Sequence, residues 1–380
     1  MNAQDLLACF RELLPISLAQ LKELVEFESH SLDKPAVDAL ARELAARFRL
    51  HGTDAQVLPV SQSGDALLAV WRSGSSARPV LLLGHLDTVW PPGTIQERPF
   101  LIEGGQASGP GIYDMKAGLL LCLLIAQALG RRMLNPGRDV IFLFTGDEET
   151  GTRGSLPHLR KAASGCRAVL CLEPPLPGGN VKTFRKGVGV FTLRVRGVAA
   201  HAGVEPEKGA SAILELSRQV VRLGEMNNRE RGTTVTVGTI RGGTASNVVP
   251  AEAEAEIDLR VVSAVEGEAA EEHIRRLRPF DGRCTLEVSG GMNRPPLERT
   301  AAVLDLYERA RGAALELGWS LGEGGTGGGS DGSFTAAMGI PTLDGLGVDG
   351  AGAHAVHECI EIGDIPRRAA LLCRIIESLD

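Results

Sequence analysis

Two adjacent carboxylates, Glu148 and Glu149, follow an apolar run at 140–144 that has the length and composition of a buried strand. Gly137 and Gly146 bound this run. The two acids are therefore expected at the carboxyl end of a strand, which is where ligands bind in open α/β sheets. Taken alone, a Glu-Glu pair is more often a solvated acidic turn, so the rest of the chain must decide between the two readings.

Histidines and further carboxylates recur at other predicted element ends. They are His85 and Asp87 after a strand at 80–83, Asp114 before a helix at 119–129, Glu173 after a strand at 168–172, and His354 within 350–358. Two imidazoles with three or more carboxylates form a nitrogen and oxygen donor set that suits Zn²⁺, with Co²⁺ or Mn²⁺ possible. The set is large enough for two ions about 3.5 to 4 Å apart, with one carboxylate bridging them.

Hydrophobic periodicity predicts an α/β protein of two domains. The order strand, helix, strand, strand, helix, strand over 186–294 resembles a ferredoxin-like α+β unit. We expect it to be inserted into a mixed-sheet α/β/α catalytic domain formed by 1–185 and 295–380, which also contains the glycine-rich loop 322–332. The catalytic domain should contain helices at 6–27, 36–50, 119–129, 156–163, 301–317 and 365–379, and strands at 55–60, 66–71, 80–83, 140–144, 168–172 and 340–343.

Composition narrows the class of protein. The 380 residues are 43% hydrophobic and 23% charged, with a net charge of −7, and basic residues form no block interleaved with aromatics. Nucleic acid is therefore not an expected partner. We expect no membrane span and no signal peptide. The seven cysteines form no Cys-x-x-Cys pair, which favours reduced thiols in a cytoplasmic protein.

Five sequence motifs contain the candidate metal-site residues. They are Gly84-His85-Leu86-Asp87-Thr88-Val89, Gly111-Ile112-Tyr113-Asp114-Met115-Lys116, Asp147-Glu148-Glu149, Glu173-Pro174 and Gly352-Ala353-His354. Together they resemble the zinc aminoacylase and carboxypeptidase superfamily, most closely the glutamate carboxypeptidases of the carboxypeptidase G type. The resemblance covers nearly the whole chain and extends to the acetylornithine deacetylases and succinyl-diaminopimelate desuccinylases. One departure is Ala117, where many relatives have glycine.

The resemblance implies a role for each metal-site residue. It implies that His85 and Glu173 hold one Zn²⁺, that Glu149 and His354 hold the other, and that Asp114 bridges them. Glu148 would be the general base, and Asp87 would accept a hydrogen bond from the second nitrogen of His85. A non-proline cis peptide is implied between Asp114 and Met115. Spacing alone does not choose between His354 and His357, but the family pattern of Gly-x-His followed by Glu, here Glu358, favours His354.

The same resemblance extends to the inserted domain, which would be a dimerisation or lid domain. His201 would reach across a homodimer and help to stabilise the tetrahedral oxyanion. Asn247, Arg260 and Arg294 would contact the substrate, where an Arg fork suits a carboxylate. Ser330 would border the same pocket. Without the resemblance, His201 would be read as a loop histidine and the two arginines as exposed surface charges.

These inferences lead to a homodimeric two-zinc metallopeptidase that cleaves the amide bond N-terminal to a free C-terminal amino acid such as Glu or Asp. Its substrate would be a small N-acyl amino acid or a peptide. The alternatives are an N-acyl amino acid deacylase of the acetylornithine deacetylase or desuccinylase type, and a non-catalytic metal-binding homologue. Glu148 argues against the last, because a protein without turnover has no need of a base between metal ligands.

Overall fold

A six-stranded mixed sheet lies at the centre of the first of two structural units. Strands β6, β3, β7 and β16 run parallel, β2 is antiparallel to β6, and β1 is antiparallel to β2. The sheet confirms the α/β class and the mixed sheet predicted from the sequence. Its strands in spatial order are β1 (Asp54–Leu58), β2 (Gly64–Trp71), β6 (Val140–Gly146), β3 (Val80–His85), β7 (Ala168–Cys171) and β16 (Thr342–Leu343).

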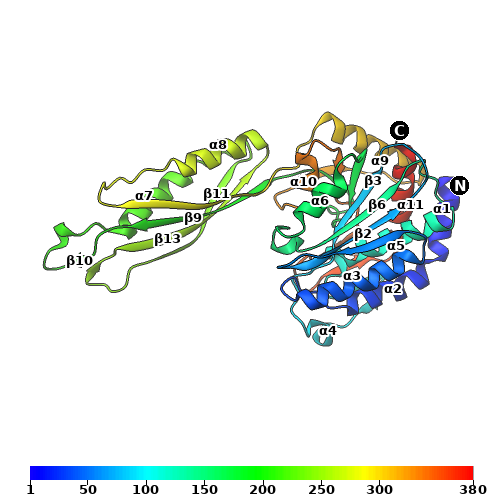
Figure 1. The fold of residues 1–380 in the computed structure, drawn as a ribbon, viewed down its shortest axis with the longest axis horizontal. Coiled ribbons are helices and arrows are strands. Elements are labelled where there is room, and N and C mark those ends of the chain that lie inside the picture. Colours follow the sequence, from blue (N-terminus) through cyan, green and yellow to red (C-terminus); the bar gives the residue numbers. More distant parts are fainter. Residues whose placement is uncertain (380) are drawn as a thin grey trace. The chain divides into compact units, whose positions relative to one another are not determined.

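Helices cover both faces of this sheet (Figure 1). Leu82 and Phe142 face the larger core, whereas their neighbours Leu81 and Leu143 face a smaller core on the other side. Successive strand residues point to opposite faces, so burial on both sides explains why these strands are uninterrupted apolar runs. The larger core contains α1 (Ala3–Glu12), α2 (Leu14–Glu26), α3 (Lys34–Arg49), α5 (Ala117–Gly130), α9 (Ala301–Glu316) and α11 (Asp364–Ser378), and the smaller contains α6 (Leu156–Ala163) and α10 (Gly332–Ala337).

The most apolar helix of the chain is part of this core. Ile112–Gly130 is long and apolar enough to cross a membrane, with a mean hydropathy of 1.6, but 89% of it is buried inside the protein. In α5 nearly every side chain is buried against the sheet or other helices. A helix that is apolar all round is expected in such a position.

Several elements differ from the sequence-based prediction. The helix expected at 6–27 is two helices that meet at Leu13, with Pro15 in the first turn of the second, where a missing N–H costs little. The glycine-rich loop contains a strand, β15 (Glu323–Thr326), which pairs with β8 (Val181–Arg185). Short elements were also missed, because they are too brief to show a period: α4 (Thr94–Glu97), and a small sheet of β4 (Leu101–Glu103), β5 (Gln106–Ser108), β18 (Cys359–Glu361) and β17 (Gly350–Ala351).

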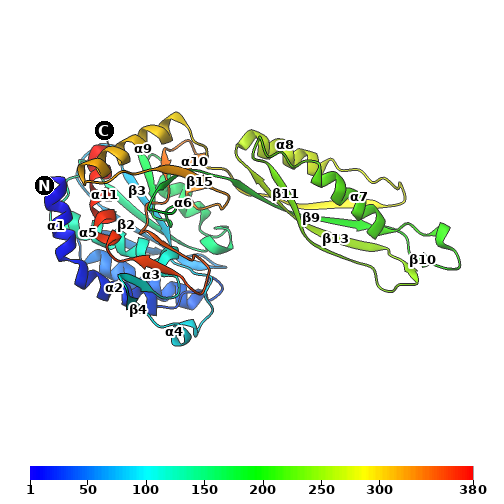
Figure 2. The same cartoon turned by 180° about the vertical axis from the view of Figure 1, so that it is seen from behind.

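The second unit has the ferredoxin-like order predicted for the insert. Its four strands are all antiparallel, and α7 and α8 lie along one face of the sheet (Figures 1 and 2). A separate core fills the space between them. In spatial order the strands are β11 (Thr234–Gly242), β13 (Glu252–Val261), β9 (Gly187–Arg196) and β14 (Thr285–Arg294), with helices α7 (Ala212–Gly224) and α8 (Ala264–Arg275) and a small pair β10 (Ala200–His201) and β12 (Val248–Val249).

The structure is a computed structural model, and it describes residues 1–379. The chain enters and leaves the second unit at neighbouring points. The second unit comprises Arg185–Glu298 and Thr326–Gly329, and the remaining segments form the first. Near the two ends of the insert, Arg185 and Leu297 exchange two backbone hydrogen bonds of 3.0 and 3.1 Å. The short segment Thr326–Gly329 was not expected to belong with the insert.

Candidate metal centre

The centre is built at the carboxyl ends of β3 and β6. These strands are parallel and in register, with His85 opposite Thr145, so the segments that follow them emerge side by side. After β6 the chain makes one 3₁₀ turn at Glu148–Thr150. Both ends lie on the central sheet of the first unit (Figure 1), which is the edge where ligands bind in sheets of this kind.

His85 is held in one tautomer by its own loop. Its ring is buried, and Nδ1 lies 2.9 Å from the backbone oxygen of Asp87. A carbonyl oxygen only accepts, so Nδ1 carries a proton, and Nε2 is the ring nitrogen that a metal would take once its own proton is lost. Nε2 lies 3.1 Å from Oδ1 of Asp114 and 3.6 Å from Oε1 of Glu173. The carboxylate of Asp87, predicted to be the partner of Nδ1, is farther away at 3.4 Å.

Asp114 lies between the two histidines. Its Oδ1 faces His85, and its Oδ2 lies 3.3 Å from Nε2 of His354. The same imidazole nitrogen of His354 is 3.0 Å from Oε1 of Glu149. A carboxylate that presents one oxygen to each side has the arrangement of a bridging ligand. The peptide bond between Asp114 and Met115 is cis, as the resemblance implied.

The five side chains therefore form two groups that share Asp114. One contains His85 and Glu173, and the other contains Glu149 and His354. Ligand atoms of His85, Asp114 and Glu149 lie within 4.8 Å of one another. Imidazole nitrogens and carboxylate oxygens at these separations fit divalent first-row metal ions.

The electrostatics of the group point the same way. Burial opposes a charge on His85, but hydrogen bonds to Asp114 and Asp87 outweigh it and raise its pKa well above the usual value. Hydrogen bonds to Asp114 and Glu149 raise the pKa of His354 to about 10. Burial alone would raise the pKa of Asp114, whereas hydrogen bonds from the two histidines lower it. The site therefore has an excess of negative charge that attracts cations, whether protons or metal ions.

Asp87 supports the turn that carries the two glutamates. Its Oδ1 accepts the backbone N–H of Glu148 at 3.1 Å, and its Oδ2 accepts that of Glu149 at 3.2 Å. Asp87 is fully buried and Glu148 is nearly so. The negative charge of Glu148 contributes to the raised pKa of His85, which places this carboxylate beside the centre.

Glu358 supports the loop that carries Asp114. It is buried, with Oε1 accepting the N–H groups of Tyr113 and Asp114 at 2.9 and 3.0 Å. Its Oε2 accepts the N–H of Gly111 at 2.9 Å and the indole N–H of Trp90 at 2.7 Å. The sequence indicated Glu358 only as part of a motif. The two histidines before it are both exposed, and His354 is the one whose ring contacts the acids.

Two further aspartates stabilise the turn after β6. The sequence analysis did not assign this role to either of them. Asp147 accepts the N–H of Gly154 at 2.7 Å. Asp331 accepts the hydroxyl of Thr145 at 2.6 Å. The only signal was the tendency of Asp to cap nearby backbone in turns. Ser330, predicted to border the substrate, is fully buried and donates to Asp344 at 2.6 Å.

The remaining predicted residues belong to the second unit, where they form two groups. His201 and Asn247 are exposed and adjacent, because β10 pairs with β12 and the N–H of Ala202 donates to the Asn247 backbone oxygen at 2.9 Å. Arg260 and Arg294 instead flank Val188, near the other end of β9.

The arginines of the second group already have contacts in the structure. The guanidinium of Arg260 forms hydrogen bonds of 2.7 to 3.1 Å to Asp258 and donates to the Gly327 oxygen at 3.0 Å. Arg294 is buried. The separation between this group and His201 is nearly the length of β9, roughly 25 Å at 3.3 Å per residue.

Known proteins agree with this architecture. Residues 81–378 match Peptidase family M20/M25/M40. Carboxypeptidase G2 of Pseudomonas sp. (strain RS-16) is 29% identical over 96% of this chain and 89% of its own. Succinyl-diaminopimelate desuccinylase of Methylobacterium sp. (strain 4-46) is 32% identical over 81% of this chain and 82% of its own.

Solved structures share the fold. Aminopeptidase PepT of Bacillus cereus ATCC 10987 has a TM-score of 0.80 at 23% identity, covering 96% of this chain and 98% of its own. The YXEP protein of Bacillus subtilis, a dinuclear metal-binding peptidase of the M20 family, has a TM-score of 0.73 at 16% identity, covering 97% and 98%. The chain is therefore a metal-dependent hydrolase that belongs to peptidase family M20/M25/M40.

Proposed function

We propose that the protein is a two-zinc carboxypeptidase that releases a C-terminal amino acid, such as Glu or Asp, from an N-acyl amino acid or small peptide. The observation that carries this proposal is the carboxylate of Asp114 between two imidazoles, each with a further glutamate. His85 and Glu173 would hold one ion, Glu149 and His354 the other. Bound ions would polarise the scissile carbonyl and make a nearby water acidic.

The other residues would move protons and position the substrate. Glu148 would take the proton of the attacking water and deliver it to the departing amine nitrogen. Asp87 would hold Glu148 and Glu149 at their separate positions through the two backbone N–H groups that it accepts. An arginine, Arg260 or Arg294, would bind the free carboxylate of the substrate in a bidentate manner, which requires the guanidinium of Arg260 to leave Asp258.

The separation of the two groups in the second unit supports a homodimer. His201 and Asn247 lie at the small pair β10 and β12 that follows one end of β9, whereas Arg260 and Arg294 flank its other end, so the two groups are separated by about the length of β9, roughly 25 Å. Both groups cannot reach one small substrate from a single chain. We propose that the arginines serve the site of their own chain, while His201 and Asn247 complete the site of the partner subunit, where His201 donates to the oxyanion.

A desuccinylase-type deacylase is the second candidate, because a desuccinylase is 32% identical over most of this chain. It would use the same residues on a different acyl group. A cytoplasmic location is proposed as well, since all seven cysteines are free thiols in the structure.

Hydrolysis of a panel of N-acyl amino acids by the zinc-loaded protein tests the proposal. The panel should pair acetyl, succinyl, folate-like and indole-acyl groups with Glu, Asp, Lys and ornithine. We expect the highest kcat/KM for aryl-acyl Glu or Asp conjugates. A preference for succinyl groups on a diamino acid would favour the desuccinylase instead.

The role of Glu148 has its own test. Glu148→Ala should keep the fold and bound zinc but lower kcat by about 10²-fold or more, because the proton transfer loses its base. Zinc content by mass spectrometry separates a lost base from a lost metal. Glu268→Ala, on an exposed surface of the second unit, is a control that should leave kcat unchanged. Turnover that survives in Glu148→Ala would contradict this mechanism.

A further inference from the structure

The first unit has a cavity at the end of the sheet opposite the metal centre. Trp71, the last residue of β2, pairs with Val140 at the start of β6, whereas Gly64 pairs with Gly146 at the end near the centre. These ends are roughly 20 Å apart at the usual rise per residue. The cavity has a volume of about 650 Å³ and lies between the ends of β2, α3 and α5.

Positive charge dominates this cavity. Its charged or titratable lining residues are His51, Arg72, Arg131 and Arg132, and among the described residues that line it there is no Asp or Glu. Arg72 pairs with Asp139 at 3.0 Å just outside. The other two arginines have no carboxylate partner within the described chain, although the protein as a whole has a net charge of −7.

The positive charge of this cavity affects the pKa of His51. Burial lowers its pKa, and the charge of Arg131 lowers it further. The backbone of His51 also packs closely on α5, since a Cβ at Gly130 would lie 2.7 Å from the His51 carbonyl oxygen. The two side chains line the same cavity, where the positive charge of Arg131 disfavours a proton on His51.

The backbone of Arg132 gives an independent reason to assign a role to its side chain. Its φ is 58°, in the left-handed region, directly after the last turn of α5. Glycine is the favourable residue at that position. A basic residue near a helix C-terminus also complements the helix dipole, and Arg131 alone would supply that. The dipole does not explain why a second arginine occupies a strained position.

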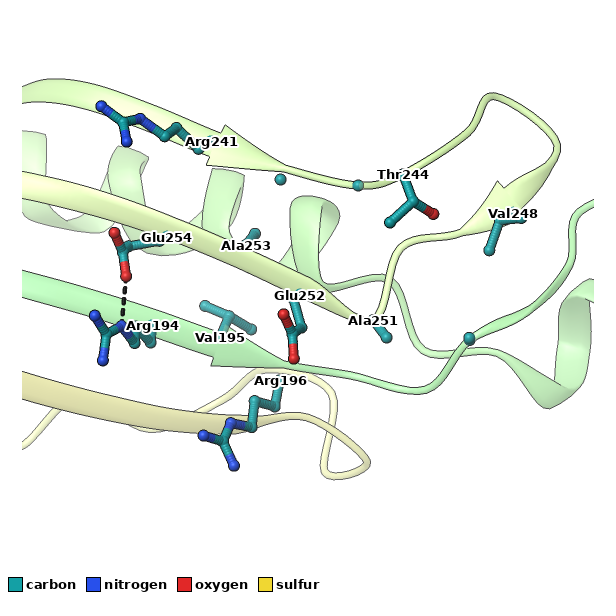
Figure 3. Close-up of a pocket in the computed structure, with 13 residues that line it drawn as sticks. Arg194, Val195, Arg196, Arg241, Thr244, Val248, Ala251, Glu252, Ala253 and Glu254 are labelled. Atoms are coloured by element: carbon teal, nitrogen blue, oxygen red, sulfur yellow. Dashed lines mark hydrogen bonds and ion pairs between the residues drawn. The ribbon is translucent and has the colours of Figure 1, made fainter.

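A rival cavity in the second unit differs in its charge balance. It has a volume of about 600 Å³ and contains Arg194, Arg196 and Arg241 (Figure 3). Glu254 lies between Arg194 and Arg241 in the register and forms an ion pair with Arg194, while Glu252 lies opposite Arg196. Such alternating cross-strand charges are the ordinary surface of an antiparallel sheet, so that cavity carries no proposal.

We propose that the cavity at the end of β2 binds a small organic phosphate. The phosphate would accept hydrogen bonds from Arg131 and Arg132, with His51 as a third donor, because clustered guanidinium groups suit a dianion. The half-buried ring of Trp71 and the side chain of Leu129 offer an apolar wall for an attached ring. The volume falls in the range of small-molecule sites. This site is independent of the hydrolytic activity.

Phenyl phosphate is a suitable probe, followed by NMR on the isotopically labelled, zinc-loaded full-length protein. The chain has three tryptophans, so the indole signal of Trp71 can be assigned with Trp71→Phe. Trp90, which contacts Glu358 beside the metal centre, reports separately on any phosphate bound to zinc. We expect saturable shifts of the Trp71 and His51 signals, and a higher pKa of His51 in the complex because the dianion offsets the charge of Arg131.

Variants separate a binding role from a structural one. Arg131→Ala and Arg132→Gly should each weaken binding about tenfold, the worth of one charge-assisted hydrogen bond. Arg132→Gly should at the same time raise Tm, since it relieves the left-handed residue. Arg42→Ala, an exposed arginine on α3, should bind as the wild type does. Benzoate should bind more weakly than phenyl phosphate, and phenol not at all.

Three results would overturn the proposal. The first is a phosphate response confined to Trp90. The second is unchanged affinity in both Arg131→Ala and Arg132→Gly. The third is an equal response to sodium chloride at the same ionic strength, which would mean that only non-specific screening was observed.

Discussion

At the scale of single residues, Glu148 and Glu149 are neighbours whose side chains serve different groups. Glu149 reaches His354 at 3.0 Å, while the negative charge of Glu148 helps to raise the pKa of His85. Their backbone N–H groups both donate to Asp87. The 3₁₀ turn thus separates two identical side chains, and a residue from another strand end fixes the turn.

Metal affinity should rise with pH. Without metal, hydrogen bonds to Asp114 and Glu149 raise the pKa of His354 to about 10, and the pKa of His85 is raised as well. Both rings are then protonated at neutral pH, and metal must displace their protons. Below the pKa of His354, each pH unit lost should lower the affinity by about tenfold per proton released.

Competition with a coloured chelator at several pH values measures this dependence. Calorimetry in buffers of different ionisation enthalpy gives the number of protons released at each pH. A zinc affinity that is flat from about pH 6 to pH 8, around the unperturbed pKa of histidine, would show that the two rings are neutral before metal binds.

At the scale of elements, α5 packs closely on the backbone that directly follows β7. A Cβ on Gly118 would lie 2.5 Å from the Leu172 carbonyl oxygen and 2.6 Å from Cε of Met115. The adjacent Ala117 is buried without such a conflict. Position 118, rather than position 117, therefore requires glycine in this helix.

Gly118→Ala should lower the free energy of unfolding by about 1 to 3 kcal/mol, because a backbone oxygen cannot move aside as a side chain can. Urea denaturation measures the change. The matched control is Gly312→Ala in α9, where a Cβ meets nothing within 4 Å. That variant should gain about 0.5 to 1 kcal/mol from helix propensity. Similar effects of both substitutions would mean that α5 can shift away from β7.

Glu358, the residue directly before β18, holds the loop before α5 through hydrogen bonds. Glu358→Ala should destabilise the fold by about 3 kcal/mol or more, because four N–H donors lose one buried acceptor. It should also weaken metal binding, since the Asp114 loop loses its support. Thermal unfolding and zinc titration check both effects. Glu361→Ala, which removes an exposed carboxylate on the strand that directly follows Glu358, should change neither.

The sequence was informative where elements are long. Buried strands such as 140–144 and the acids at their ends were predictable, because parallel strands bring their carboxyl ends to one edge. Short strands such as β17 and β18 have no readable period. Their position, and with it the contact of Glu358 with the Asp114 loop, depends on tertiary pairing.

At the scale of the whole molecule, the second unit presents candidate site residues near one end of β9 and at the small pair β10 and β12 that follows its other end. In a homodimer whose active sites take residues from both chains, a variant that is defective in the first unit should complement a variant that is defective in the second unit. Glu148→Ala and His201→Ala should each be nearly inactive. After subunit exchange, an equal mixture should recover about a quarter of wild-type activity, because half of the dimers are hybrids with one intact site of two.

The control for this experiment mixes Glu148→Ala with Glu173→Ala. Both changes lie in the first unit, so no hybrid contains an intact site and no recovery is expected. Subunit exchange is verified by native mass spectrometry with differently labelled chains. If exchange is complete and His201→Ala with Glu148→Ala still gives no activity, His201 does not act across the dimer.

The backbone pairing of Arg185 with Leu297 bears on how the insert evolved. Their mutual hydrogen bonds hold the entry to and exit from the insert about one strand spacing apart. More than a hundred residues lie between them. The sheet of the first unit nevertheless constrains only the distance between these two chain ends, as it would if a tight turn joined them. The insert could therefore have been gained, lengthened or exchanged in evolution while the order of the six central strands stayed the same.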